Sequence, residues 1–169
     1  MSVLSVRDLV VDIRTGQGRV HAVRGVDFAI DAGETLAVVG ESGSGKTMTA
    51  LAVMGLLPDT AELRGEIALD GERIDGFDAR ACNRLRGARM GMVFQNPMSS
   101  LNPTMRIGEQ IAEVLVTHRG ASWAEAQTRA VQLLDRMQVS DAAARARQYP
   151  FEFSGGMLQR AMIAMAMAC

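Results

Sequence analysis

The glycine-rich stretch GESGSGKT, residues 40–47, constrains the fold most, because the residues before and after it have different structural preferences. TLAVVG, residues 35–40, is an unbroken apolar run of the kind that forms a strand buried on both faces. TMTALAVMGLL, which begins at Thr47, has the composition of a helix and ends before Pro58. The sequence therefore predicts a buried parallel strand, a tight loop and a helix in direct succession.

The loop has the residue types needed to hold a phosphate, since it matches G-x-x-x-x-G-K-[ST] at every fixed position. Glycines at 40, 43 and 45 allow successive backbone N–H groups to point inward. Lys46, the single lysine among 18 basic residues, can reach between β- and γ-phosphates, where a guanidinium would be too wide. The Thr47 hydroxyl suits Mg²⁺. The flanking strand and helix favour this interpretation over a glycine-rich turn with a surface lysine.

Guanine recognition is excluded within these residues. A GTPase reads guanine through an Asn-Lys-x-Asp motif, and a chain whose single lysine is Lys46 cannot contain it. No aspartate lies three residues before a glycine, which removes the second GTPase motif. We therefore expect ATP with Mg²⁺.

Antiparallel strands are predicted around the loop. Residues 5–13 and 19–30 are β-rich and are separated by the turn-like TGQG. Residues 65–74 alternate apolar and polar around Asp-Gly, a strong hairpin signal. MGMVFQ, residues 90–95, predicts another short buried strand.

From residue 98 the apolar period becomes helical. One predicted helix carries Ile107, Ile111, Val114 and Leu115 and ends at Gly120, and a second starts at a capping box of Ser122 with Glu125. The second helix has a stripe formed by Trp123, Ala130, Leu133, Leu134 and Met137. The predicted fold is an α/β P-loop core with an N-terminal antiparallel β subdomain and an inserted helical subdomain. We expect the domains to be 1–97, 98–153 and 154–169.

Composition excludes several classes of protein. A chain that is 48% hydrophobic and 22% charged is globular rather than disordered, and a net charge of −1 gives no basic field for nucleic acid. Cys82 and Cys169 have no metal-ligand spacing. No apolar run approaches the roughly 20 residues that span a bilayer, so a membrane role would need a partner.

A second candidate anion site lies in FEFSGGMLQR, residues 151–160. Ser154 can cap a helix, and Gly155 and Gly156 expose N–H groups at its N-terminus. Alone, this pattern is better explained as an ordinary N-cap with flexible glycines. It gains weight from the phosphate loop upstream and from Gln95, which stands at a predicted strand end between them.

The three motifs, in this order, resemble the Walker A loop, Q-loop glutamine and signature motif of the nucleotide-binding subunits of ATP-binding cassette (ABC) transporters. The resemblance covers essentially the whole chain. The segments VFQNPMSSLNPTMRIGEQIAEVL and YPFEFSGGMLQRAMIAMA are similar to those of oligopeptide, dipeptide and nickel importers. In those importers methionine is the fifth signature residue, as Met157 is here.

The resemblance implies a role for each motif. Two subunits sandwich ATP between the Walker A loop of one and the signature motif of the other, with Lys46 on phosphate, Thr47 and Gln95 near Mg²⁺, and Gln95 sensing the attacking water. The catalytic candidates are Gln95 and Lys46. The candidate ATP-binding residues are Gly40, Glu41, Ser42, Gly43, Ser44, Gly45, Lys46, Thr47, Ser154, Gly155, Gly156 and Met157.

Two departures from the family pattern affect these expectations. The family places an aromatic residue before the Walker A strand to stack on adenine, yet no Phe, Tyr or Trp precedes Phe28, and Ile13 or His21 lies near that position. The Walker B strand, with its Mg²⁺-binding Asp and catalytic Glu, and the switch histidine are expected just past Cys169. We therefore expect an N-terminal fragment that hydrolyses ATP near background and leaves its parallel sheet open. The uncapped apolar run AMIAMAMAC also favours a fragment over a true terminus docked on a partner.

The predicted function is the ATP-binding subunit of an ABC importer for peptides or a related solute such as nickel. Its expected partners are membrane permease subunits, a second ATPase subunit that is a sister chain, and indirectly an extracytoplasmic binding protein, with no nucleic acid. It would lie peripherally on the cytoplasmic face of the membrane. The alternatives are a non-transport ABC ATPase and a truncated product that only binds nucleotide. The solute itself is not determined by the sequence.

Overall fold

The computed structural model describes residues 2–169, which form two compact units. Met1–Cys82 is called the β unit and Asn83–Cys169 the helical unit, and each is described by itself. Within the described residues, no helix is long and apolar enough to cross a bilayer.

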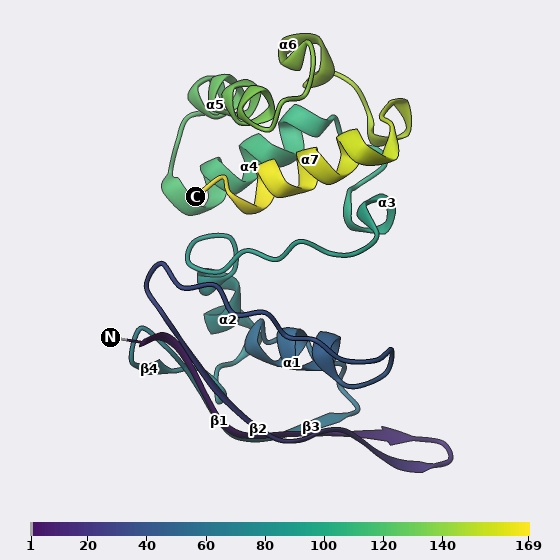
Figure 1. The fold of residues 1–169 in the computed structure, drawn as a ribbon. Coiled ribbons are helices and arrows are strands. Elements are labelled where there is room, and N and C mark those ends of the chain that lie inside the picture. Colours follow the sequence, from purple (N-terminus) through teal and green to yellow (C-terminus); the bar gives the residue numbers. More distant parts are fainter. Residues whose placement is uncertain (1) are drawn as a thin grey trace. The chain divides into compact units, whose positions relative to one another are not determined.

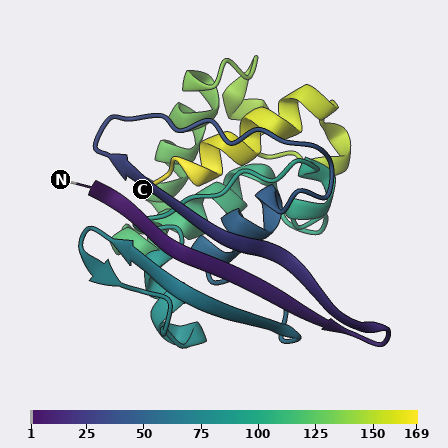
Figure 2. The ribbon, with the colours of Figure 1, turned by 60° about the horizontal axis from the view of Figure 1, so that its bottom comes forward.

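The β unit is built on a four-stranded antiparallel sheet with the order β2-β1-β3-β4 (Figures 1 and 2). Its first two strands form one long hairpin, in which Thr15 pairs with Gly18 and Ser2 with Asp31. This confirms the predicted antiparallel subdomain, with longer strands than the sequence pattern suggested. The strands are β1 (Ser2–Thr15), β2 (Gly18–Asp31), β3 (Ala61–Leu69) and β4 (Glu72–Arg73).

A bulge in β1 adjusts the alternation of side chains so that the sheet covers an apolar core. The pairing of β1 with β3 shifts between Arg7 and Val10, where Asp8 has a positive φ of 45°. Gly65 faces this bulge, and a Cβ on it would stand 2.3 Å from the Asp8 carbonyl oxygen. Only glycine fits there. The buried apolar side chains of the sheet are Val6, Leu9, Val11, Val23, Ile67 and Leu69.

Two helices complete the β unit. Helix α1 (Lys46–Val53) contacts β1 and β2, as Figures 1 and 2 show, and α2 (Ala79–Leu85) follows the β3–β4 hairpin. Helix α1 ends at the cap Met54, earlier than the predicted limit before Pro58. The hairpin at Asp70-Gly71 is confirmed, since Leu69 pairs with Glu72.

The predicted buried strands at 35–40 and 90–95 are not formed in the described residues. The first segment has no strand assignment, and its Val38 and Val39 side chains are 55% and 89% exposed. The second makes only an isolated bridge from Arg86 to Met90. A parallel strand exists only where a neighbour takes up its N–H and C=O groups, and all paired strands described here are antiparallel. Apolar character alone therefore led to a wrong prediction.

The helical unit surrounds a core of aliphatic side chains. Buried leucines, isoleucines and alanines come from α4, α5 and α7, which contact one another pairwise (Figure 1). Its helices are α3 (Pro97–Ser100), α4 (Ile107–Arg119), α5 (Trp123–Arg136), α6 (Ala142–Arg145) and α7 (Gly155–Ala166), with a 3-10 turn at Pro150–Glu152.

The predicted end of α4 and the predicted start of α5 are confirmed. Gly120 follows α4 in a left-handed conformation with φ 65°, and Ser122 and Glu125 form the capping box of α5. Hydrogen bonds from Ser122 hold the pKa of the Glu125 carboxyl below its ordinary value. The apolar stripe is confirmed for Ala130, Leu133 and Leu134, which are buried, but not for Trp123, which is 49% exposed at the first helical position.

Candidate nucleotide-binding site

The phosphate loop, Gly40–Thr47, leads directly into α1 and requires its glycines. Gly43 and Gly45 have φ angles of 83° and 94°, a region that side chains with a Cβ rarely adopt. A Cβ on Gly45 would also stand 2.4 Å from the carbonyl oxygen of Ala22 in β2. The loop therefore packs against β2 with no room for a side chain, and this leaves its backbone at the N-terminus of α1.

The Lys46 ammonium is directed at the loop itself. Its Nζ donates to the carbonyl oxygens of Gly40 at 2.8 Å and Glu41 at 2.7 Å, and to the Ser44 hydroxyl at 3.2 Å. These three acceptors use all the donors of an ammonium group. Because all of them lie within the loop, the charge of Lys46 is centred over the cradle that its glycines make.

The loop borders two hollows on the β unit. The larger, of about 420 Å³, lies within the ordinary range of small-molecule pockets and is shared by Gly43, Ser44 and residues 21–24 and 26 of β2. The smaller, of about 220 Å³, is lined by Val20, His21 and the loop as far as Met48. His21 contributes to both. Residues of the loop and of β2 thus line the same two hollows.

The residues around the loop fit a phosphate with Mg²⁺ better than a metal alone. The first N–H groups of α1 and the Lys46 ammonium are donors, which suit an anion. The described residues contain no cluster of three His, Cys, Asp or Glu side chains that would hold an ion by themselves. The exposed Thr47 could supply one oxygen ligand, and Mg²⁺ commonly combines such a ligand with waters and phosphate oxygens.

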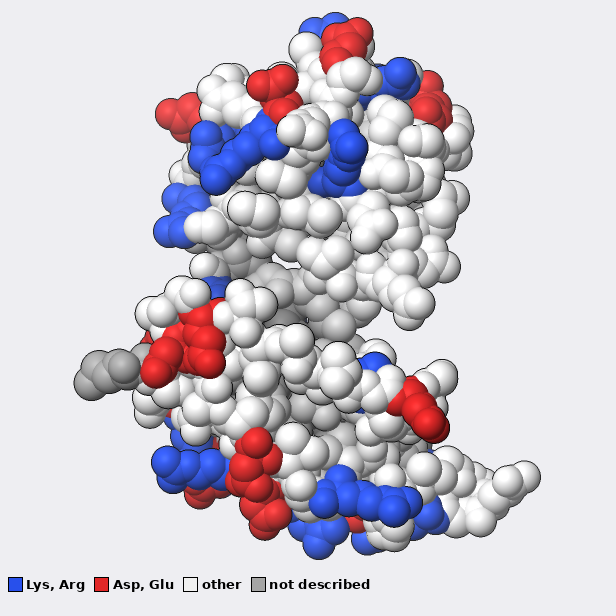
Figure 3. All heavy atoms as spheres, in the orientation of Figure 1, with Lys and Arg blue, Asp and Glu red and all other residues white. Residues whose placement is uncertain are grey.

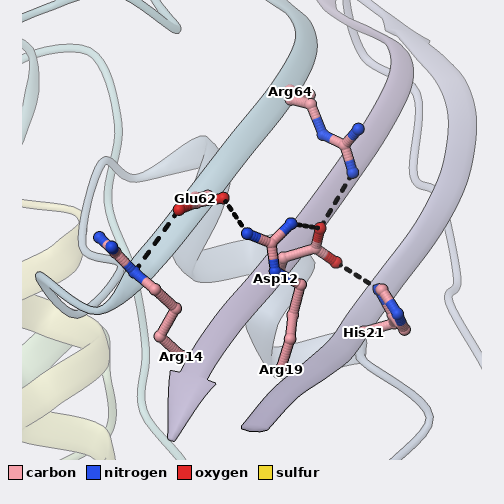
Figure 4. A network of polar contacts seen from close by, with 6 residues as sticks. All are labelled: Asp12, Arg14, Arg19, His21, Glu62 and Arg64. Carbon is pink, nitrogen blue, oxygen red and sulfur yellow. Dashed lines mark hydrogen bonds and ion pairs between the residues drawn. The ribbon is translucent and has the colours of Figure 1, made fainter.

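A buried carboxylate lies on the sheet near these hollows (Figure 4). Asp12 of β1 is only 1% exposed. Its Oδ1 lies 2.6 Å from His21 Nδ1, and its Oδ2 accepts a hydrogen bond from Arg64 at 2.9 Å. Arg19 adds an ion pair at 3.5 Å and is itself paired with Glu62 at 3.1 Å. The hydrogen bond with His21, followed by the charges of His21, Arg64 and Arg19, holds the pKa of Asp12 below its ordinary value.

The other ion pairs of the sheet are of a different kind. In the view of Figure 3, acidic and basic side chains are interspersed over the β unit. Arg73, for example, contacts Glu66 at 2.9 Å and Asp75 at 3.0 Å, with 60% of its own side chain exposed. Such exposed pairs contribute little to stability. Asp12 was missed in the sequence, where its one signal is an acidic residue inside the apolar strand segment LVVDI.

The remaining predicted site residues belong to the helical unit. Ser154 caps α7 by accepting a hydrogen bond from the Met157 N–H at 3.4 Å, as predicted for an N-cap. Gly155 and Gly156 have nothing within 4 Å of an added Cβ. Gln95 is exposed and directly precedes Asn96, the cap of α3, and α3 contacts α7. The structure thus brings Gly40–Thr47 together in one unit, and Gln95 and the signature segment, Ser154–Met157, belong to the other.

Comparison with known proteins adds three findings. The sequence model of the family described as ABC transporter matches residues 23–169. The oligopeptide transport ATP-binding protein OppD of Salmonella typhimurium is 49% identical over 98% of this chain and 50% of its own length, and OppD of Escherichia coli is 48% identical over 99% and 50%. The chain spans about half the length of the curated relatives it matches.

A solved structure provides the third finding. The dimeric, post-hydrolysis state of the ATP-binding cassette MJ0796, described as bound to ADP and Pi, has a TM-score of 0.86 to this chain. Sequence identity is 28%, and the match covers 98% of this chain and 69% of that one.

Proposed function

Because the chain belongs to the ABC transporter family and has the fold of its ATP-binding cassette, we propose that it acts in the ATP-binding subunit of a peptide importer. The relatives at 48% to 49% identity are named for oligopeptide transport. Those names support peptides over nickel as the solute class. They also support transport over a soluble ABC ATPase with no membrane partner.

The observation that carries the proposal is the glycine cradle with Lys46 at its centre. An incoming phosphate can take over donors that Lys46 now gives to Gly40, Glu41 and Ser44, because Lys46 and Ser44 line the smaller hollow. The N-terminus of α1 adds N–H groups and a partial positive charge. Mg²⁺, when bound with the nucleotide, neutralises phosphate charge, and the Thr47 hydroxyl is the group of this loop that would hold it. Gly43 and Gly45 already hold the loop in this conformation before a phosphate binds, with φ angles that other residues rarely adopt.

We assign the other predicted residues to the same reaction. In this proposal Ser154, Gly155 and Gly156 contact the γ-phosphate of ATP held by a second subunit, and Gln95 senses Mg²⁺ and the attacking water. The open space around both signature glycines supports an external ligand, since nothing in residues 2–169 stands close enough to require their small size. Residues 1–97 would be the ATP-binding core, 98–153 the part that docks on the membrane partner, and 154–169 the signature region.

The proposed partners follow from that arrangement. The cassette of similar fold is described as dimeric, which supports a second ATPase subunit, and we favour a sister chain. Two membrane permease subunits would bind the pair on the cytoplasmic face, and an extracytoplasmic binding protein would deliver the peptide. We further propose that residues 1–169 by themselves hydrolyse ATP near background, because the predicted motifs include no metal-binding or catalytic carboxylate.

Two substitutions of Lys46 test nucleotide binding in the complete protein. Lys46→Ala and Lys46→Arg should both abolish ATP binding measured by titration calorimetry, the second because a planar guanidinium does not fit the cradle. Arg80→Ala, which removes an exposed positive charge from α2 of the same unit, is the matched control and should leave the affinity unchanged. ATP affinity that survives Lys46→Ala would refute the assignment.

The carboxylate proposal has its own test. Residues 1–169 and the complete protein are compared for phosphate release from ATP, each with and without Lys46→Ala. We expect turnover only in the complete protein. Release by residues 1–169 that disappears with Lys46→Ala would show that this chain already contains its catalytic base.

A further inference from the structure

The helical unit has a hollow of about 490 Å³, within the ordinary range of small-molecule pockets. It is bordered by the first turn of α4, the middle of α5, and α6 with the two residues that follow it. Helix α5 contacts both α4 and α6, as Figure 1 shows. Neither the phosphate loop nor the signature segment lines this hollow. ATP binding therefore does not explain it.

The two buried residues of the hollow, Gly108 and Ala146, are in close contact. A Cβ on Gly108 would stand 2.8 Å from the Ala146 carbonyl oxygen. The N–H groups of Ile107 and Gly108 donate to the carbonyl oxygens of Gln148 and Ala146 at 2.9 and 2.8 Å. The first N–H groups of α4 are thus already used within the unit, so a ligand in the hollow would have to be bound by side chains.

Two exposed side chains of the hollow are hydrogen-bond donors without a partner. The Arg147 guanidinium and the Gln127 amide make no hydrogen bond or ion pair within residues 2–169. Arg145, two positions earlier, does have such a partner, since it donates to Gln148 at 2.8 Å. A free guanidinium is a planar fork that can bind a carboxylate or a phosphate through two hydrogen bonds. The hollow therefore favours a ligand with a negatively charged end.

An acidic side chain in the same hollow narrows the class of ligand. The Glu109 carboxylate accepts a hydrogen bond from the Arg106 backbone N–H at 3.2 Å, and its other oxygen lies 3.9 Å from the Arg106 guanidinium. This carboxylate would repel a phosphate with two negative charges and attract an ammonium group. A ligand with an ammonium at one end and a carboxylate at the other matches both charges.

We propose that this hollow binds a short peptide by its two charged ends, with the carboxylate at Arg147 and Gln127 and the ammonium at Glu109. Free amino acids carry the same two groups. A volume of about 490 Å³ has room for roughly 16 water-sized groups, which exceeds one small amino acid and suits a peptide of a few residues. The choice of a peptide rests on the proposed function, because an importer of peptides releases them on the side of the membrane where its ATPase subunits lie.

The test measures binding to the complete protein by titration calorimetry, with trialanine as the probe at millimolar concentrations. Trialanine should bind, whereas free alanine, N-acetyl-trialanine and trialanine amide should each bind about tenfold more weakly, since each lacks contacts that the full zwitterion makes. Arg147→Ala should weaken trialanine binding by about tenfold, the loss of a charge-assisted hydrogen bond. Arg129→Ala, at an exposed arginine of α5 that does not line the hollow, is the matched control and should leave binding unchanged.

Glu109→Gln tests the ammonium end separately. Glutamine can replace glutamate in the capping box at the start of α4, so the helix is preserved. This variant should weaken trialanine binding by about tenfold. It should leave the weaker binding of N-acetyl-trialanine unchanged, because that probe has no ammonium.

Three outcomes would overturn the proposal. Absence of trialanine binding at millimolar concentrations would show that the hollow is not a peptide site. Trialanine binding that is unaffected by Arg147→Ala, in an exposed side chain whose loss the fold tolerates, would show that the peptide binds elsewhere. Inorganic phosphate that binds more tightly than trialanine would show an anion site. Retained ATP binding in Lys46→Ala would instead refute the proposed function, and it has no bearing on the trialanine titrations.

Discussion

Two loops of this protein place serine and glycine at the start of a helix, and their glycines are explained in opposite ways. In the phosphate loop, Gly43 and Gly45 have positive φ angles, and a Cβ added to Gly45 would clash with the carbonyl oxygen of Ala22. In the signature segment, Gly155 and Gly156 lie in α7 with open space around them. The first pair is needed for the chain to fold, whereas nothing in the described residues needs the second.

This difference separates a requirement of the backbone from a requirement of a ligand. A glycine that the fold needs says only that the loop is tight, and its chemistry must be argued from other groups such as Lys46. A glycine that the fold does not need lowers helix stability by roughly 0.5–1 kcal/mol relative to alanine. Two such glycines open α7, and the proposed contact with a second subunit would give them a role.

Gly45→Ala should have the largest effect on stability. The substitution forces a Cβ into the left-handed region and to within 2.4 Å of a backbone oxygen that cannot move aside. We expect the free energy of unfolding of the β unit to fall by about 3 kcal/mol, measured by urea denaturation.

The control for Gly45→Ala is Gly16→Ala at the tip of the long hairpin, where the added methyl meets nothing within 4 Å. Its unfolding curve should stay within about 0.5 kcal/mol of the wild type. If Gly45→Ala behaves like this control, the cradle is not the tight structure described here.

Gly155→Ala and Gly156→Ala should lower ATP hydrolysis without lowering stability. Each added methyl would occupy the space proposed for the γ-phosphate of the opposite subunit, so we expect kcat for ATP hydrolysis in the assembled transporter to fall by about 100-fold, as for loss of one transition-state donor. Thermal stability should not fall, because alanine is the better helix former. A loss of stability equal to that of Gly45→Ala would remove the distinction between the two loops.

The sequence predicted those features whose causes are local. The phosphate loop, the Asp70-Gly71 hairpin and the Ser122–Glu125 capping box each depend on residues within a few positions of one another. The strands predicted at 35–40 and 90–95 failed because pairing depends on partners that the apolar pattern does not reveal.

The Asp12 network escaped prediction for a related reason. Arg64 lies 52 positions from Asp12 and reaches it only through the pairing of β1 with β3. Helical periodicity also predicted that Trp123 is buried. It is half exposed because it is the first residue of α5, where the ring projects beyond the core. The predicted motifs each lie within a short stretch of sequence, whereas the Asp12 network joins residues that only strand pairing brings together.

We expect Asp12 to make part of the protein's stability sensitive to acid. Because the folded pKa of Asp12 is lowered, mainly by His21, the network stabilises the protein above the ordinary carboxyl range near pH 4, and this stabilisation is lost as the pH falls through the lowered pKa. Asp12→Asn should lower stability at pH 7 and flatten its decline between about pH 5 and 2.

The measurement is urea denaturation at several pH values. Asp75→Asn serves as a comparison, because hydrogen bonds from Arg73 also lower the pKa of Asp75, which lies just after β4 with its side chain 12% exposed. A wild-type profile that stays parallel to that of Asp12→Asn over the whole range would show that Asp12 is not the acid-labile group.

The smallest effect concerns Ser122 and Ser154, the N-caps of α5 and α7. Their comparison separates a structural role from a proposed ligand role. Ser122 takes part in a reciprocal box, accepting from the Glu125 N–H at 3.3 Å and donating to the Glu125 carboxylate at 2.7 Å. Ser154 has a single long bond of 3.4 Å to Met157. Ser122→Ala should therefore cost about 1 kcal/mol of unfolding free energy and Ser154→Ala about 0.5 kcal/mol. The rate of ATP hydrolysis should fall more for Ser154→Ala than for Ser122→Ala, since Ser154 is the serine proposed to contact a phosphate. If the two variants lower the hydrolysis rate equally and the unfolding free energy equally, Ser154 is an ordinary helix cap.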